Sequence, residues 1–393
     1  MKKLKKEKTY LLLFFIAIIV RLFFYLSAAK THWLDRFFLP VTSGQDFFQV
    51  PNGARSFLRG GDFQGNVDGK ENVYINCCGV NKNVYHPFFT LLIGLPLQFL
   101  PPWTAYYSWL ALHFLADAAI IYFLFKKFGN HKLLLPAVFV FLVSGFGYYE
   151  IVNNQFHFLL STVAFFLLYE ISKKKDSLKG AFFYLFGLLV KPIGALWFPS
   201  LFLHRFFKVS LIGVFLFCAI SLPFLRLPSA AYFFNNLKST VLESHYPDWN
   251  VFYILDYFGI QGNFVKPVKF LLAGAILFFS FKKKKKTFAV LFLWIIYSLA
   301  MYQSTFPYHY SVLPPIFALS ILLGVIKFNL LGKISAFLIT MPAPLLISSL
   351  LKFTDFTLRH RFEKLIFISW SNLGLLFLII SLLTSSFFSK NED

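Results

Sequence analysis

The sequence predicts an all-α fold, a polytopic bundle of about 12 transmembrane helices. Composition is the first observation: 58% of the 393 residues are hydrophobic, 56 are Phe, and only 14% are charged. A soluble core cannot bury so much apolar surface. The second observation is the pattern, because apolar runs alternate with short clusters of Lys and Arg. Together they indicate an integral-membrane protein, with membrane lipid as a partner.

The individual spans follow from the length of the apolar runs. A helix that crosses the roughly 30 Å hydrocarbon layer needs about 20 predominantly apolar residues, and Pro or Gly interrupts some of the runs. The short pair on either side of Lys191 is expected to form a broken, re-entrant hairpin. The predicted spans are 10–28, 103–125, 133–149, 153–171, 178–190, 193–203, 209–226, 266–281, 287–303, 308–326, 333–351 and 365–387.

The distribution of Lys and Arg predicts the orientation of these spans. Residues 1–9 are rich in Lys and precede the first span, and no Ala-x-Ala cleavage site follows it, so we expect a retained span. By the positive-inside rule, the amino terminus and the later clusters lie in the cytoplasm. The loop 352–364 is the one exception, since its cations fall outside. The later clusters are 126–127, 173–175, 205–208, 282–286 and 327–333.

One domain is expected over residues 1–393, with a first extracytoplasmic loop at 30–102 and the remaining spans over 103–387. The apolar stretch from His86 to Leu100 is about 14 residues long and precedes Pro101, which is too short for a span. We therefore expect it to lie as a short helix in the outer interface. A crossing here would also reverse every later cation cluster.

The net charge of +21 does not indicate a nucleic-acid partner. The cations fall between apolar runs instead of forming a basic surface with interleaved aromatic residues. The three cysteines show neither metal-ligand spacing nor a disulfide framework, although a bridge that involves Cys77 or Cys78 stays open. Neither Asp46 nor Asp62 belongs to an Asp-x-Asp pair. We expect a metal-independent protein without a cofactor.

Polar residues in four segments are predicted to meet at the outer ends of the spans. Polar groups at membrane depth are costly and often functional. The first loop offers the acids Asp46 and Asp62, and an acid, an amide cluster, a cation and a histidine suit a phosphorylated lipid with a polar acceptor. The other three segments are Asn153–His157, Lys191 with Pro192, and Tyr308–Tyr310.

Each of these groups also has a structural interpretation. Asp46 alone reads as a solvated loop residue. Lys191 could extend its ammonium to the interface, and His309 could be a satisfied interfacial histidine. The Asn and Gln side chains could cap helices or form hydrogen bonds between them. The functional interpretation therefore depends on all four segments facing one compartment.

The order of several segments resembles the integral-membrane glycosyltransferases of the GT-C superfamily, in particular the bacterial polyprenyl-phosphate-mannose-dependent α-mannosyltransferases. Residues 45–49 followed by 54–63 are similar to the family's first-loop pattern, an Asp-Phe pair before a short helix with a Gly-rich end. Tyr85–Phe88 is similar to its Tyr-x-Pro-Pro juxtamembrane helix, with His86-Pro87 in place of two prolines.

The resemblance continues along the chain to about residue 325. Asn154–Phe156 stands where the family has a Gly-Gln-x-Asn element, an imperfect match. Residues 178–198 are similar to its Gly-rich span closed by Lys-Pro, here Lys191-Pro192. Two later segments, Asp248–Tyr253 and Pro307–Leu313, look like further family elements. The ordered series is more specific than any single motif.

This resemblance implies a GT-C fold and an inverting sugar transfer at the outer face of the cytoplasmic (inner) membrane. The donor would be a polyprenyl-phosphate-linked sugar, with mannose suggested and arabinose or glucose left open, and the acceptor a lipid or a glycan. Asp46 would be the general base, and Lys191 and His309 would bind the donor phosphate. Further substrate contacts would come from Asp62, Arg55, Arg59, His86, Asn154, Gln155 and Tyr308.

Two other functions remain open from the sequence. A polyprenyl-linked glycan polymerase or ligase would also have about a dozen spans, but its large loop is expected late in the chain. A membrane transporter would be favoured by acids within the spans, where we identify only Asp117. No duplicated half with matching broken helices is apparent, which argues against a transporter built from inverted repeats.

Overall fold

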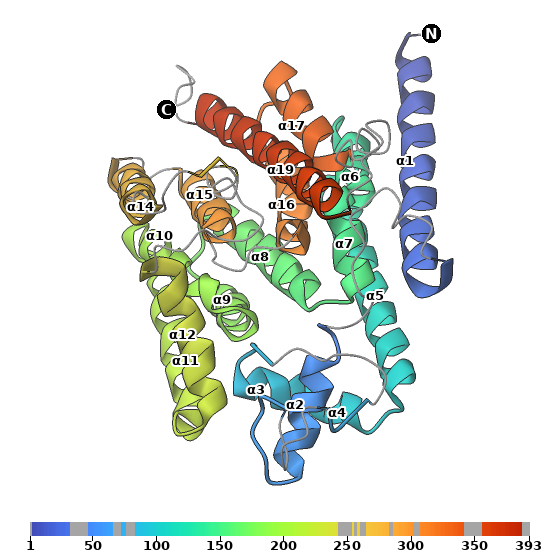
Figure 1. Ribbon diagram of the computed structural model, residues 1–393. Coiled ribbons are helices and arrows are strands. Elements are labelled where there is room, and N and C mark those ends of the chain that lie inside the picture. Colours follow the sequence, from blue (N-terminus) through green and yellow to red (C-terminus); the bar gives the residue numbers. More distant parts are fainter. Residues whose placement is uncertain are drawn as a thin grey trace.

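The computed structural model is helical throughout the residues that it describes, with no strand among them (Figure 1). The all-α class is thus confirmed. The predicted family segment Asp248–Tyr253 and the cysteines Cys77 and Cys78 lie outside the described residues. The description covers residues 2–31, 46–65, 72–75, 83–242, 254, 258–259, 265–282, 286–301, 307–341 and 356–386.

Short helices dominate, and several are divided by π-helical or 3-10 turns. The main helices are α1 (Lys2–Leu26), α2 (Gln49–Leu58), α3 (Pro87–Phe89), α4 (Leu95–Gln98), α5 (Pro102–Phe128), α6 (Leu134–Val143), α7 (Gly145–Asn153), α8 (His157–Ser172), α9 (Leu178–Val190), α10 (Phe198–Leu203), α11 (Gly213–Ser221), α12 (Pro228–Leu242), α14 (Val265–Lys282), α15 (Thr287–Ala300), α16 (Leu313–Leu322), α17 (Leu330–Thr340) and α19 (Phe356–Ser386).

The predicted 12 spans are not shown by these helices. Within the described part of the chain, only α5 and residues 361–386 of α19 are single helices long and apolar enough to cross a membrane. The pair α6 and α7, bent by 45° at Ser144, would make a third if it is one span. The predicted span 266–281 corresponds to α14, a helix of 18 residues that is not among these candidates. The remaining predicted spans correspond to apolar helices of 10–17 residues or are interrupted.

Two interruptions have clear causes, one of them a distant contact and the other a proline. At Ser144 the backbone is extended, and its hydroxyl donates a hydrogen bond of 3.2 Å to the Ile339 carbonyl. At Lys191 the backbone is also extended, and Pro192 opens the 3-10 helix η4 (Pro192–Trp197). The residue before a proline is pushed out of the helical region, so α9 ends there. The predicted break at Lys191 is present.

The described residues of the segments 46–65, 72–75 and 83–100 form a small unit at one end of the molecule, with α2, α3 and α4 side by side in Figure 1. Helix α2 packs on the π-helical segment η3 (Thr90–Gly94), where a Cβ at Gly94 would lie 2.6 Å from the Val50 carbonyl oxygen. Pro87 begins α3, and the His86 side chain accepts a hydrogen bond from the Phe88 amide. The stretch 87–98 is thus a short helix, as expected.

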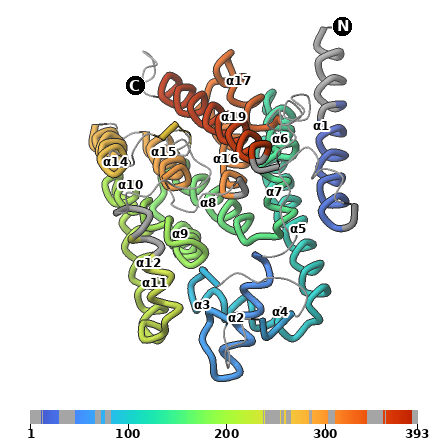
Figure 2. Tube along the Cα trace, viewed as in Figure 1, coloured from blue at the N-terminus to red at the C-terminus, as the bar shows by residue number. Residues whose placement is uncertain are grey.

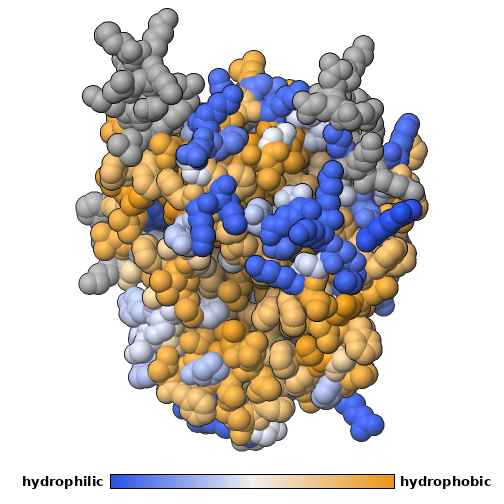
Figure 3. Space-filling view, turned by 180° about the vertical axis from the view of Figure 1, so that it is seen from behind, coloured by the Kyte–Doolittle hydropathy of each residue, from blue (hydrophilic) through white to orange (hydrophobic). Residues whose placement is uncertain are grey.

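The core lies where α8 meets its neighbours. Helix α8 contacts α5, α9, α15 and α16, and Figure 2 shows its green trace in the middle of the chain's fold. Seen from behind in Figure 3, hydrophobic side chains cover most of the lower half, and hydrophilic ones gather in the upper half and middle. Apolar side chains such as Phe215 and Leu271 are exposed to more than two thirds, at 71% and 73%. This apolar surface suits contact with lipid.

Candidate functional site

The site is built on the turn between α7 and α8. Helix α7 ends where Asn154 adopts a left-handed backbone with φ of 49°, a conformation that Asn tolerates better than most residues. The Asn154 amide donates a hydrogen bond of 2.8 Å to the Tyr106 carbonyl of α5. The next residue is Gln155, and the Trp109 indole donates a hydrogen bond of 3.2 Å to its backbone carbonyl.

Gln155 connects the first loop to this turn. Its amide nitrogen donates a hydrogen bond to the Asp46 carboxylate, and its amide oxygen accepts one of 2.7 Å from the Tyr85 hydroxyl. Gln155 and Tyr85 are buried, whereas Asp46 is half-buried. Tyr85 therefore fixes which end of the Gln155 amide faces Asp46. The hydrogen bond from Gln155 thus orients a carboxylate on a residue that is only half-buried.

Lys191 comes to the same place from the break between α9 and η4. Its ammonium lies 5.5 Å from the centroid of the Tyr85 ring, within the range of a cation–π interaction. It also interacts electrostatically with the carboxylates of Asp46 and Glu150. The Lys191 side chain is only 5% exposed, so it does not extend to the surface.

Two histidines and an acid complete the cluster. The Glu150 carboxylate accepts a hydrogen bond of 2.9 Å from the Phe158 amide at the start of α8, which stabilises that helix end. Its other oxygen lies 3.8 Å from Nδ1 of His157. The rings of His157 and His309 meet edge to face, with centroids 4.3 Å apart. His309 arrives on the 3-10 helix η8 (Pro307–Val312), which packs on α7 and α8.

The structure thus brings together four of the residues singled out from the sequence. Asp46, Gln155, Lys191 and His309 come from four segments of the chain and lie in one continuous cluster. We call the group Asp46, Tyr85, Glu150, Gln155, His157, Lys191 and His309 the acid–cation cluster.

Other predicted substrate contacts lie apart from this cluster or are turned elsewhere. Asn154 faces Tyr106, as described above. Asp62 accepts a hydrogen bond of 2.8 Å from Ser229 on α12. Arg55 lies over the Tyr74 ring at 5.5 Å, and Arg59 is exposed at the end of α2. The side chain of Tyr308 lies outside the described residues.

His86 also has a structural environment. Its Nε2 is 3.0 Å from the Ser221 hydroxyl of α11, and its ring meets the rings of Phe217 and Phe233. Burial lowers the pKa of His86 to about 4. The imidazole is therefore neutral at pH 7 and caps α3 without supplying a positive charge.

Sequence reasoning missed Tyr85, Glu150 and His157 as members of the cluster. Tyr85 and His157 each stood inside a segment that had been singled out, but without a role. Glu150 directly follows the predicted span 133–149 and received no role. Asp117 was thought to be the one acid within a span, yet Glu150 lies in α7 and Glu170 in α8. The spacing of Glu150 and Gln155 could have indicated the link. Five positions separate them, which correspond to the last turn of α7 and its cap Asn154.

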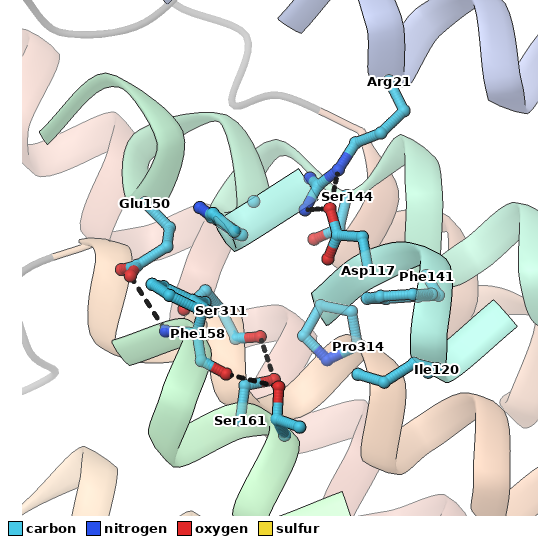
Figure 4. A pocket seen from close by; sticks show the side chains of 13 residues that line it. Arg21, Asp117, Ile120, Phe141, Ser144, Glu150, Phe158, Ser161, Ser311 and Pro314 are labelled. Carbon is cyan, nitrogen blue, oxygen red and sulfur yellow. Dashed lines mark hydrogen bonds and ion pairs between the residues drawn. The ribbon is translucent and has the colours of Figure 1, made fainter. Parts of the chain in front are cut away.

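A small polar cavity adjoins the acid–cation cluster at Glu150 (Figure 4). It measures about 20 Å³, enough for one water molecule. Glu150 lies on one side of it and the pair of Arg21 and Asp117 on the other, with the hydroxyls of Ser161 and Ser311 between them. Four buried polar atoms of its lining have no hydrogen-bond partner among the described residues. They are Arg21 Nη1, His113 Nδ1, Glu150 Oε2 and Ser311 Oγ.

The pair of Arg21 and Asp117 ties α1 to α5. Two guanidinium nitrogens of Arg21 reach the same carboxylate oxygen, at 2.7 and 2.5 Å, and the Tyr25 hydroxyl donates to it at 2.8 Å. A side chain on Gly147 would collide with the Arg21 guanidinium. Glycine at this position therefore lets α7 pass close to the pair.

Asp117→Asn is expected to destabilise the protein by roughly 3–5 kcal/mol, because it leaves the buried Arg21 without its counter-charge. A thermal unfolding curve in detergent measures this as a clear loss of melting temperature. The half-exposed pair of Arg359 and Glu363 on α19 provides the control. Glu363→Gln should change the melting temperature little. Equal effects of the two substitutions would refute the structural role of the buried pair.

Comparison with known proteins found no matching family model, no matching curated protein and no matching solved structure.

Proposed function

We propose that this chain is a GT-C type glycosyltransferase of the cytoplasmic membrane, with its site on the extracytoplasmic side. It would move a sugar, for which we propose mannose, from a polyprenyl-phosphate donor to a lipid or glycan acceptor. One observation carries the proposal. An oriented carboxylate on the half-buried Asp46 interacts electrostatically with a buried ammonium, that of Lys191, with His309 in the same cluster.

The chemistry assigns a separate task to each group. Asp46 takes the proton of an acceptor hydroxyl while that oxygen attacks C1 of the sugar. The bond from C1 to the phosphate oxygen breaks, configuration inverts, and the polyprenyl phosphate leaves with the electron pair. A positioned base of this kind contributes about 10²- to 10⁴-fold to the rate. The Gln155 amide holds the carboxylate in place for the transfer.

The leaving phosphate gains negative charge as the bond breaks. Lys191 and His309 would neutralise that charge, and His157 adds a second imidazole within 4.3 Å of His309. Fixed donors in a site of low dielectric stabilise such charge more strongly than water does. Without the donor, Asp46 supplies a counter-charge to the Lys191 ammonium. Donor phosphate would exchange with this carboxylate as the partner of Lys191.

A transporter is the second candidate, favoured by one observation. Asp117 and Glu150 are both buried and line the same polar cavity, which is an arrangement used for proton relays. Against it, Asp117 is already paired with Arg21. A polyprenyl-linked glycan polymerase or ligase is the third candidate, and it would use the same cations on a longer acceptor.

The direct test incubates membranes that contain the protein with radiolabelled polyprenyl-phosphate-mannose and with extracted cell lipid or glycan. Transfer of label to an acceptor is expected, in EDTA as well as without it. Label in chains that grow by many units would favour a polymerase. Absence of transfer from mannosyl, arabinosyl and glucosyl donors alike would contradict the proposal.

The orientation of the site gives a separate expected result. In a variant without native cysteines, a cysteine in place of the exposed Arg59 should react in intact cells with an impermeant thiol reagent. A cysteine in place of the exposed Lys174 should react only after the membrane is opened. The reverse pattern would place Asp46 in the cytoplasm and exclude the proposed donor orientation.

A further inference from the structure

A second polar pocket lies at the far end of the bundle from the acid–cation cluster. It has a volume of about 310 Å³. Helix α8 begins at His157 in the cluster and ends at Ser172 in the pocket wall. At 1.5 Å per residue its 16 residues separate the two places by roughly 24 Å. Helix α16 also runs from the cluster's end of the bundle toward this pocket, which therefore cannot be part of the first site.

Three lysines from three different connections line this pocket. Lys174 follows α8, Lys286 precedes α15, and Lys327 follows α16. The described residues that line the pocket include no Asp or Glu. Three ammonium groups that line one pocket repel one another. An anion bound between them is attracted to all three, which offsets this electrostatic repulsion. The pocket thus selects negative charge.

Hydrogen-bond donors surround the same hollow. Thr287 and Ser385 line it with their hydroxyls, and Thr287 opens α15, where helix amide groups carry partial positive charge. The wall is also held in place: the Lys327 amide donates to the Ser385 hydroxyl of α19 at 3.0 Å. Thr287 is tied to His204 at 2.9 Å. Cations and hydroxyl donors on fixed elements suit the oxygens of a phosphate group.

The positive-inside rule explains why lysines lie at this end of the molecule. It does not require that lysines from three loops share one hollow with hydroxyl donors. We infer that this pocket binds a phosphate-bearing anion, either the headgroup of an anionic lipid or free phosphate. Basic pockets between transmembrane helices on the cytoplasmic side recognise lipid headgroups by this chemistry. The inference stands independently of the proposed transfer reaction.

The test measures the melting temperature of the purified protein in detergent against increasing ligand. The ligands are dihexanoyl phosphatidylglycerol, its zwitterionic phosphatidylcholine counterpart, and inorganic phosphate. A ligand that binds only the folded protein raises its melting temperature. We expect phosphatidylglycerol to stabilise the protein and phosphatidylcholine to have no effect. Stabilisation by inorganic phosphate at similar concentration would identify free phosphate as the source, and its absence would identify the lipid.

The variant removes the three charges with Lys174→Gln, Lys286→Gln and Lys327→Gln. Each lysine near an anionic surface contributes about fivefold to affinity, so the triple variant should bind about 10²-fold more weakly. A triple Lys→Arg variant, which keeps the charge, should bind the anion. If the neutral triple variant fails to fold, Lys286→Gln alone should weaken binding about fivefold.

The matched control neutralises three exposed lysines of another cationic segment and should retain wild-type affinity. Equal loss in control and pocket variants would mean that general charge causes the binding. Unchanged affinity in the pocket variants, or no stabilisation of the wild type by either anion, would also overturn the inference. The control substitutions are Lys126→Gln, Lys127→Gln and Lys132→Gln.

Discussion

Asp46→Asn is expected to lower the rate of sugar transfer by about 10²- to 10⁴-fold, the usual contribution of a positioned general base. The substitution keeps the size of the side chain and removes its ability to accept the proton. The amide can still meet Gln155, whose side-chain amide oxygen accepts from Tyr85 and whose backbone carbonyl accepts from Trp109. The protein should therefore fold and accumulate normally. Initial rates with radiolabelled donor measure the effect, and the melting temperature checks the fold.

Asp62→Asn is the matched control, since Asp62 lies in the same loop. Its carboxylate accepts a hydrogen bond from Ser229 and takes no part in the acid–cation cluster. We expect transfer close to the wild-type rate. If Asp46→Asn kept more than about a tenth of wild-type turnover, a lost base could not be the explanation. A similar loss in both variants would indicate a disturbed loop instead.

The helical class could be predicted because composition alone requires it. The number of full spans could not, because an apolar run records hydrophobicity and not continuity of the helix. Residues 133–149 read as one span, yet the backbone bends by 45° at Ser144. The hydrogen bond that holds this bend comes from Ile339, almost 200 residues away. Nothing in the local sequence contains that partner.

The candidate site, too, was predictable from the sequence only in part. The proximity of Asp46, Lys191 and His309 was predictable from the expected topology, in which each follows or precedes an apolar run at the outer face. Their connections were not predictable. Gln155 reaches Asp46 only because Asn154 turns left-handed, and Glu150 interacts with Lys191 although the two are 41 positions apart in the sequence. Arg55 and Arg59 share the loop of Asp46 but face Tyr74 and solvent.

Burial decides between two interpretations of Lys191. A lysine that extends along apolar surface keeps its ammonium in water. Lys191 is instead 5% exposed, against the Tyr85 ring and between two carboxylates. Several interactions thus hold its charge inside the protein. Burying an ammonium costs free energy even when carboxylates are near it. The binding of an anionic phosphate would offset part of that cost.

Lys191→Met is expected to reduce transfer by on the order of 10²- to 10³-fold, the scale of one lost charge-assisted donor in a sheltered site. Methionine preserves the length and apolar stem of the side chain and removes only the charge. The loss should appear in both KM for the donor and kcat, because the ammonium would hold the phosphate before and during departure.

Lys191→Arg supplies the control that separates charge from packing. It keeps the positive charge but changes its geometry, so partial recovery of the rate is expected. Lys179 gives the comparison at an exposed position, since it lies on the opposite end of α9 and outside the cluster. Lys179→Met should leave both constants unchanged. Values within about threefold of wild type for Lys191→Met would mean that the ammonium only balances Asp46, and the phosphate would need another cation.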